Sequence, residues 1–408
     1  MMGETIMGKT LCILLALAVV TCGCLKVEVP SEAVRIGGGR QKSVEDDGRT
    51  IPTQLPAAGS SGSWADVAAR MAGQLFLSAE KGVIFYAYDT LAYPDEPVDL
   101  VADVVSARSL KGVKEVTVEF RDTDGERIAR TDTDKDGRAV AEWTPPQAGN
   151  YPLTAEIVAV DDDDDEELLE LSPAPLVVSA RQKDAKLAII DLDHTVVGSS
   201  FFRVLTVGAT PMADSARVTK RIADRYSIVY LTHRPDLMTR KSKQWLIDNG
   251  YPAGPLLVSR MNEALGSSGA YKTERLKAVR EAFPNTGIGI GDKISDAQAY
   301  LDNGLTAYLI PNYDDDDPDE LRETAEGIRK PKPKDRLQVV SNWRQIEAGI
   351  FDGEEFPAEA FARSLKRRAE NIEREQQRRE DEDDDDDDDD DDDEDDDEDD
   401  GDGWGGWI

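Results

Sequence analysis

Two aspartates with one residue between them directly follow an apolar run in the middle of the chain. The run Leu187–Ile190 predicts a buried strand, and Asp191 and Asp193 come where that strand ends. In an open α/β sheet the carboxyl ends of the strands border the ligand crevice, so both side chains can reach it. Two carboxylates this close repel each other unless a cation or a shared proton neutralises them. Taken alone, the motif also fits a strand that runs into a polar turn.

Three more polar clusters follow, each at the end of an apolar run or at the start of a helical one. The strand predicted at Ser227–Leu231 ends at Thr232, His233 and Arg234. A helical pattern begins close to Lys272. The glycine-rich run Thr286–Gly291 ends at Asp292, with Asp296 shortly after it. The clusters are therefore expected at one edge of a single sheet.

This set of motifs resembles the haloacid dehalogenase-like phosphohydrolases over about residues 186–310. Its order is Asp-x-Asp-x-Thr, hydrophobic-Thr, Lys and Gly-Asp-x-x-x-Asp. Within that superfamily, the segments Leu231–Pro235, Trp245–Leu257 and Gly291–Tyr300 look like the lipin-type phosphatidate phosphatases and their relatives. The resemblance implies an α/β fold with a doubly wound parallel sheet. Neither gap between the motifs has room for a cap domain, so we expect a capless fold with an open crevice.

The resemblance also implies a role for each motif residue. Asp191 attacks phosphorus and forms an aspartyl phosphate, and Asp193 acts as general acid and then as general base. Thr232 holds a phosphoryl oxygen, and Lys272 neutralises the negative charge of the nucleophile and the phosphate. Arg234 is a candidate contact for the phosphate or the head group of the substrate.

A Mg²⁺ ion is the expected cofactor, because an oxygen-only site with open water positions suits it. The implied metal site comprises Asp191, Asp193 (through its backbone carbonyl), Asp292 and Asp296. Zinc is disfavoured for want of Cys and His ligands. The two histidines of the chain, His194 and His233, each lie beside a motif position rather than at one, and His194 stands where Gly or Asp is common.

The N-terminus predicts export. Lys9 precedes the apolar run Leu11–Val20, which is too short to span a membrane and is typical of a secretory signal. Small residues before Cys24 resemble a bacterial lipoprotein cleavage site, with Cys22 as the second candidate and an ordinary signal peptide as the alternative. A lipid on Cys24 would anchor the protein to a membrane at the periplasm or cell surface. All cysteines lie in this segment, Cys12 included, so the folded domains have no thiol.

The negative charge of the chain is concentrated near the C-terminus. The chain of 408 residues has a formal net charge of −35, but residues 380–402 hold 22 acidic residues and no basic one. The remainder has 61 acidic and 48 basic residues, a net charge of −13. Without a basic surplus to displace counterions, a nucleic-acid partner is not expected. The sequence does not predict an oligomeric state.

These changes in composition predict six segments. They are a signal or lipoprotein segment (1–24), a disordered tether (25–62), a short helix with an all-β immunoglobulin-like sandwich (63–181), the phosphatase domain (182–352), a charged helix (353–379) and an acidic disordered tail (380–408). Near the end of the phosphatase domain, Val339–Phe351 predicts an amphipathic helix with Ser341 as its N-cap.

Short apolar runs separated by turn residues predict the sandwich. Gly149–Tyr151 resembles the Gly-x-Tyr corner of bacterial immunoglobulin-like domains. Asp132–Gly137 begins like a calcium loop, but Trp143 stands where an EF-hand needs its twelfth-position Glu. We therefore predict a hairpin turn there, and a second one at Asp122–Gly125.

The function expected from these features is Mg²⁺-dependent hydrolysis of a phosphomonoester. An open crevice near a membrane favours a lipid phosphate such as phosphatidate, with a protein or oligonucleotide phosphate as the second possibility. One alternative is a non-catalytic lipid-phosphate-binding module, because relatives of the lipin domain in phosphatidylinositol-transfer proteins have lost the acid/base carboxylate. Another is a surface adhesion protein whose sandwich binds a ligand.

Overall fold

The computed structural model describes residues 79–107, 111–161, 163–198, 209–260 and 267–387. The signal segment with Cys24, the tether and the short helix expected before the sandwich lie outside these ranges, as do residues 388–408. Within the described ranges, no helix is both long enough and apolar enough to cross a membrane.

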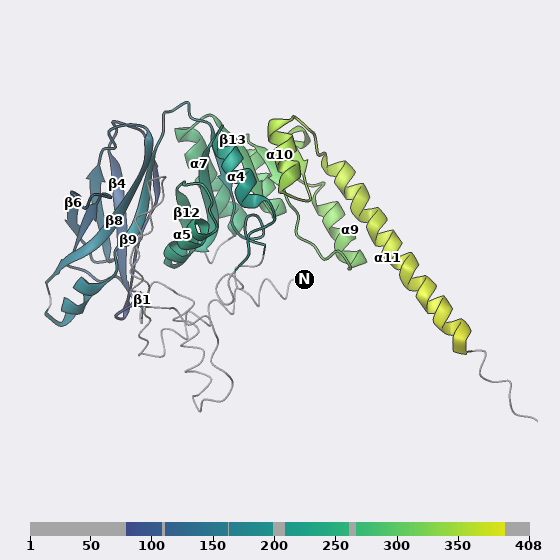
Figure 1. Ribbon diagram of the computed structural model, residues 1–408, viewed down its shortest axis with the longest axis horizontal. Coiled ribbons are helices and arrows are strands. Elements are labelled where there is room, and N and C mark those ends of the chain that lie inside the picture. The colour runs from purple at the N-terminus through teal and green to yellow at the C-terminus, as the bar shows by residue number, and fades with distance from the viewer. Residues whose placement is uncertain (1–78, 108–110, 162, 199–208, 261–266, 388–408) are drawn as a thin grey trace, which may run out of the picture. The chain divides into compact units, whose positions relative to one another are not determined.

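The first described domain is a β-sandwich (Figure 1). One sheet has the order β1-β2-β4-β7, and the other has the order β3-β9-β8-β5-β6. Alternate residues of the strands face inward, and the side chains of the two sheets pack together in one apolar cluster. This cluster includes Leu100, Val118, Phe120 and Leu176. The bounds are β1 (Ala79–Glu80), β2 (Val83–Ala87), β3 (Thr90–Ala92), β4 (Val98–Ser106), β5 (Val116–Arg121), β6 (Arg127–Asp132), β7 (Arg138–Trp143), β8 (Gly149–Val160), the 3₁₀ turn η1 (Asp163–Glu170) and β9 (Ala174–Ala180).

One of the two predicted hairpins is wrong. Asp122–Gly125 does join the antiparallel pair β5 and β6, but Asp132–Gly137 joins β6 to β7, which lie in different sheets. The local chemistry is that of a turn, since the Asp134 carboxylate accepts the N–H groups of Asp136 and Arg138 at 2.8 and 3.0 Å. A turn motif fixes the local backbone and leaves open which sheet the next strand enters.

The Gly-x-Tyr segment makes the corner that its pattern suggests. The Tyr151 hydroxyl donates to the Gln147 carbonyl at 2.7 Å, and its ring packs edge-on against Trp143 with 5.1 Å between ring centroids. This local bond fixes the entry of the chain into β8.

The second domain has a six-stranded parallel sheet with the order β12-β11-β10-β13-β14-β15. From β10 the chain adds β11 and β12 on one side of the sheet, and it then crosses over to add β13, β14 and β15 on the other side. The strand order therefore reverses between β10 and β13. Ligands bind at such a switch point in open α/β sheets. The bounds are β10 (Leu187–Ile190), α4 (Ser215–Ala223), β11 (Ser227–Pro235), η2 (Asp236–Met238), α5 (Thr239–Asp248), β12 (Leu256–Ser259), α7 (Ser268–Ala282), β13 (Thr286–Gly291), α8 (Ile294–Asp302), β14 (Thr306–Leu309), η3 (Lys334–Arg336), β15 (Leu337–Val339) and α10 (Trp343–Phe351).

The end of this sheet differs from the prediction. Val339 belongs to β15, and the helix begins only at Trp343. Its N-cap is Asn342, whose side chain accepts the N–H groups of Arg344 and Gln345, so the prediction of Ser341 as N-cap is wrong by one residue. Ser and Asn cap helices about equally well, and a short apolar strand directly before the helix gives no separate signal.

The sandwich and the α/β domain belong to one compact unit and share a buried ion pair. Lys243 of α5 lies 2.6 Å from Asp89, and neither side chain is exposed. The Asp89 carboxylate also accepts the N–H groups of Val177 and Leu256 at 2.6 and 2.8 Å, one from each domain. Lys243 donates in addition to the Pro175 carbonyl at 2.8 Å.

Helices α9 (Pro318–Gly327) and α11 (Ala358–Asp387) belong to a second unit. An ion pair between Arg322 of α9 and Glu373 of α11 joins them, and each helix buries small or apolar side chains. Helix α11 covers most of the predicted charged helix and continues beyond it to Asp387.

Candidate active site

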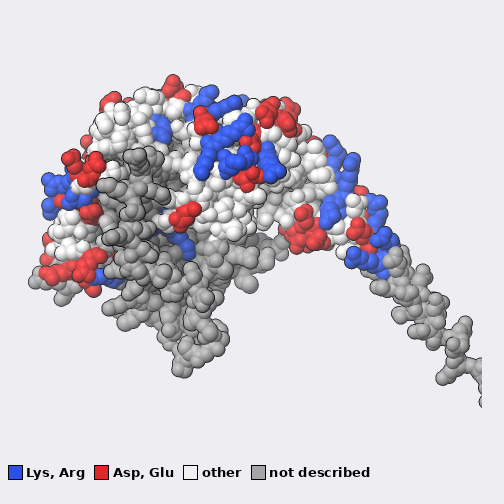
Figure 2. All heavy atoms as spheres, in the orientation of Figure 1, with Lys and Arg blue, Asp and Glu red and all other residues white. Residues whose placement is uncertain are grey.

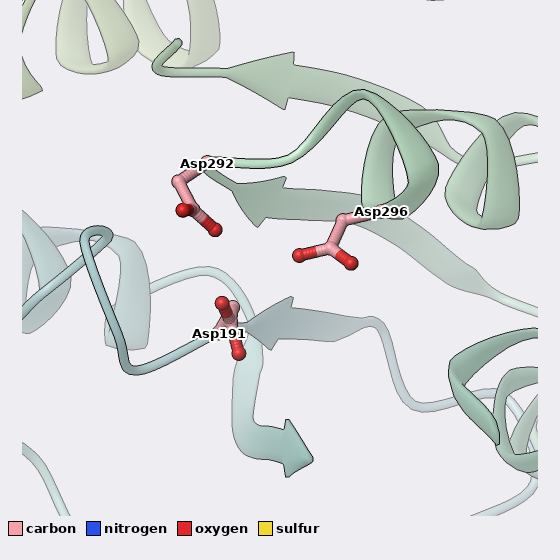
Figure 3. A group of neighbouring side chains, drawn as sticks. All are labelled: Asp191, Asp292 and Asp296. Carbon is pink, nitrogen blue, oxygen red and sulfur yellow. The ribbon is translucent and has the colours of Figure 1, made fainter. Parts of the chain in front are cut away.

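Three buried carboxylates converge at the switch point of the sheet (Figure 3). Asp191 follows β10, Asp292 follows β13, and Asp296 lies in the first turn of α8. Ile190 pairs with Ile290 in parallel register, so the residues that follow the two strands emerge side by side. One carboxylate oxygen from each of the three lies within 4.8 Å of the others.

Lys272 is the cation of this cluster. Its ammonium group lies 2.9 Å from Asp191 Oδ1 and 2.6 Å from Asp296 Oδ2, and its side chain is 1% exposed. Burial lowers the pKa of Lys272, but the two carboxylates outweigh it and hold the pKa well above the usual range. Burial raises the pKa of Asp292 well above its ordinary value, and the charges of Asp191 and Asp296 add to this. One ammonium therefore faces three carboxylates, which leaves an excess of negative charge.

This donor set fits a small divalent cation. Asp292 Oδ1 and Asp296 Oδ1 are buried and have no hydrogen-bond partner, although buried polar atoms are nearly always paired. Carboxylate oxygens are the ligands that Mg²⁺ prefers, and a dication would neutralise the excess charge. The predicted metal ligands Asp191, Asp292 and Asp296 are thus brought together.

The fourth predicted metal residue, Asp193, points its carboxylate elsewhere. Arg234 holds it in a forked pair, with Nε 3.0 Å from Oδ2 and Nη2 2.6 Å from Oδ1. Burial raises the pKa of Asp193, but the Arg234 guanidinium outweighs this and holds the pKa below its usual range. The side chain is 17% exposed, so the carboxylate is accessible from solvent. Its geometry agrees with a carboxylate that exchanges protons and does not bind the metal.

The remaining predicted residues lie on the strand and turn beside this cluster. Thr232 is buried in the last part of β11, and its hydroxyl accepts the N–H of Arg234 at 3.2 Å. His194 has a backbone φ of 54°, in the left-handed region that Gly and Asp tolerate best. That conformation agrees with the expectation, taken from the family resemblance, that Gly or Asp is common at this position. The His233 ring packs against Tyr271, with 5.4 Å between centroids.

Two serines that support the site were not predicted. Ser242 of α5 accepts a bond from Arg234 Nη1 at 2.9 Å. The Ser259 hydroxyl, at the end of β12, donates to the carbonyls of His233 and Arg234, both at 3.0 Å. Ser259 could have been found from the sequence, because it is a polar residue directly after the apolar run Leu256–Val258. Nothing in the pattern of α5 distinguishes Ser242.

Residues 188–310 match the family model described as "PITM 1-3, LNS2 domain". The matched range runs from β10 to the residue after β14 and contains every candidate catalytic residue. It is also the region whose motifs resemble the lipin-type phosphatases. A comparison with curated proteins gave no match.

Several solved structures resemble parts of the chain. The D00-D0 domain of Intimin is 18% identical over 24% of this chain and 47% of that chain, with a TM-score of 0.19. The CARDB domain of PF1109 from Pyrococcus furiosus is 16% identical over 24% of this chain and 94% of that chain, with a TM-score of 0.17. A glycosyl hydrolase family 2 member from Bacteroides cellulosilyticus is 11% identical over 64% and 41%, with a TM-score of 0.24.

Proposed function

We propose that this protein is a Mg²⁺-dependent phosphomonoester hydrolase that works through an aspartyl phosphate. The observation that carries the proposal is the division between two neighbouring aspartates. Asp191 lies in the three-carboxylate cluster against Lys272, whereas the Asp193 carboxylate lies outside it on Arg234. This division supports a nucleophilic role for Asp191 at a cation site and a proton-transfer role for Asp193.

In the first step, an Asp191 oxygen forms a bond to phosphorus while the bond from phosphorus to the alcohol oxygen breaks. Asp193, in its protonated form, gives its proton to the departing alcohol oxygen and becomes the carboxylate that Arg234 stabilises. The ammonium of Lys272 stabilises the negative charge near Asp191, and the Thr232 hydroxyl donates to a phosphoryl oxygen in the proposed complex. A Mg²⁺ ion on Asp191, Asp292 and Asp296 would supply further positive charge.

In the second step, the Asp193 carboxylate takes a proton from a water molecule. The water oxygen bonds to phosphorus as the bond to Asp191 breaks, which releases inorganic phosphate and restores both carboxyl groups. Each transfer requires the Asp193 side chain to stay free of the metal, and its pairing with Arg234 agrees with this.

A lipid phosphate such as phosphatidate is the proposed substrate. The match of residues 188–310 to an LNS2 domain supports this class of substrate, and so does the resemblance of the motif sequences to lipin-type phosphatases. We also propose that the protein is exported and held at a membrane through a lipid on Cys24, which would keep the site near lipid head groups. A protein or oligonucleotide phosphate is the second substrate class that an open site would admit.

The test is phosphate release from p-nitrophenyl phosphate by the purified chain without its signal segment. Activity should require Mg²⁺ and disappear with EDTA. Asp191→Asn should abolish turnover, a loss of several kcal/mol in transition-state stabilisation. Asp302→Asn, at an exposed aspartate at the end of α8, is the matched control and should keep full activity. Full activity of Asp191→Asn would refute the nucleophile assignment.

The alternative function is binding of a lipid phosphate without turnover, and the match to the LNS2 domain of PITM 1-3 favours it as the second candidate. Phosphatidate in mixed micelles, a phosphopeptide and a sugar phosphate should be compared in one assay. Phosphatidate should give the highest kcat/KM. Retention on phosphatidate vesicles with no release of phosphate would favour the binding module.

A further inference from the structure

Arg234 is a buried arginine under a partly exposed aspartate. Its side chain is 1% exposed, against 17% for Asp193, so the guanidinium lies on the protein side of the pair. The two nitrogens of the fork reach both oxygens of the carboxylate, at 3.0 and 2.6 Å. A forked pair of this kind fixes the plane of a carboxylate as well as its charge.

Arg234 itself is fixed by several elements. Nη1 donates to Ser242 of α5, the backbone N–H donates to Thr232 of β11, and the carbonyl accepts from Ser259 of β12. The chain just after Arg234 is tied to the sandwich, because the Tyr88 hydroxyl donates to Asp236 at 2.8 Å. Hydrogen bonds to three elements of the α/β domain therefore hold Arg234 in place beside Asp193.

We propose that Arg234 is a positioning residue that orients the Asp193 carboxyl for proton transfer and keeps it out of the three-carboxylate cluster. The inference rests on the proposed phosphatase function and deepens it. It also assigns Arg234 a task different from the direct contact with the substrate that the sequence suggested. The guanidinium is nearly inaccessible, and two of its nitrogens are committed to Asp193.

This role predicts a dependence on the leaving group. An alkyl phosphate, such as that of a glycerolipid, must receive a proton as its alcohol departs, whereas p-nitrophenolate departs without one. A misplaced Asp193 therefore slows the first step for the alkyl substrate and leaves the rate of that step almost unchanged for the aryl substrate. The second step needs Asp193 for both substrates, so their steady-state rates would fall alike. Release of the alcohol in the first turnover reports the first step alone and therefore distinguishes the alkyl from the aryl substrate.

The experiment compares Arg234→Gln and Arg234→Lys with the unaltered chain in Mg²⁺, using p-nitrophenyl phosphate and a short-chain phosphatidate. First-turnover release of the lipid alcohol should fall about 100-fold or more, the usual contribution of general acid catalysis, while release of p-nitrophenol should fall less than about fivefold. Arg234→Lys should resemble Arg234→Gln, because lysine keeps the charge but lacks the fork. Asp193→Asn should show the same selectivity, and the double variant should lose little more than either single one.

Arg217→Gln is the matched control, since Arg217 makes a forked pair with Glu347 on the surface at 2.9 and 2.7 Å. It should change neither rate. Equal losses on both substrates, or a rise in KM alone, would overturn the inference in favour of direct phosphate binding. Failure of both Arg234 variants to fold, judged by their melting curves, would make the role structural and overturn it as well. If the unaltered chain released neither alcohol, the proposed function itself would fail.

Discussion

At the scale of single residues, the same chemical group has different roles according to its neighbours. Asp191 faces two other carboxylates and Lys272, while Asp193, two positions further along the chain, faces Arg234. The order of polar residues after apolar runs predicted which residues meet at the sheet edge, because parallel strands end together. The partner of Asp193 was not predicted, since the pairing depends on side-chain direction and not on spacing.

Binding of a cation should be visible in stability. Mg²⁺ at 100 times its Kd should stabilise the folded chain by about 2.7 kcal/mol and raise its Tm by about 5 °C, because the ion binds only the assembled carboxylates. Asp292→Asn should abolish this rise, and its Tm without Mg²⁺ should be higher than that of the unaltered chain because one buried charge is removed. Thermal denaturation with and without Mg²⁺ measures both. Asp302→Asn should keep the rise, and an undiminished rise in Asp292→Asn would exclude Asp292 as a ligand.

Two glycines of β13 differ in how much space surrounds them, and replacement by alanine tests this difference. A Cβ added at Gly289 would lie 2.3 Å from the Tyr300 ring, whereas one at Gly287 would lie 3.3 Å from the edge of the Tyr226 ring. Tyr300 is buried and its hydroxyl donates to the Ile290 carbonyl, so its ring has little room to move. Gly289→Ala should lower the free energy of unfolding by about 1–3 kcal/mol, and Gly287→Ala by less. Urea titration of both variants decides this, and equal losses would contradict the packing argument.

At the scale of elements, each domain could be predicted from its own pattern, but their connection could not. Short apolar runs separated by turn residues predicted the sandwich, and apolar runs that end in polar clusters, with the family resemblance they carry, predicted the parallel sheet. The contact between them depends on Asp89 and Lys243, which in the sequence are ordinary charged residues in a turn and a helix. Long-range pairs of this kind leave no periodicity, and the sheet membership of β7 was missed for the same reason.

Removal of Lys243 should destabilise both domains together. Lys243→Met leaves the Asp89 carboxylate buried without its cation, which costs about 3–5 kcal/mol. Calorimetry should show one transition for the sandwich and the α/β domain, shifted to lower temperature in the variant. Lys114→Met, in an exposed pair with Glu115 at 2.9 Å, should change the free energy of unfolding by less than about 1 kcal/mol. Two separate transitions, or a loss below that of the control, would show that the domains are independent.

At the scale of the whole molecule, one surface brings opposite charges side by side. Figure 2 shows basic side chains gathered beside acidic ones over the region of α4 and α10. Arg217 and Arg221 both bind Glu347, and Arg344 binds Asp214 at 2.7 Å. Arg217, Arg221 and Arg344 of this surface are thus each paired with a carboxylate.

The same surface predicts part of the response to acid. Hydrogen bonds from Arg217 and then Arg221 lower the pKa of Glu347 to about 2, from an ordinary value of 4.5. Because the pKa is depressed in the folded state, Glu347 contributes stability above pH 4.5, and this contribution is lost as the pH falls from 4.5 through about 2. Glu347→Gln should therefore have a lower urea midpoint than the unaltered chain at pH 7, and most of this difference should be lost at pH 2. A difference at pH 2 as large as that at pH 7 would contradict the assignment.

The two outer strands of the parallel sheet have a further consequence. The N–H of Leu256 in β12 is taken by Asp89, and the N–H of Val339 in β15 is taken by the carbonyl of Phe356, where the returning chain forms a short bridge. Exposed strand edges act as templates on which a second molecule can add a strand, and aggregates grow in this way. With a sandwich carboxylate on one edge and a backbone bridge on the other, the sheet is protected from joining edge to edge with another copy.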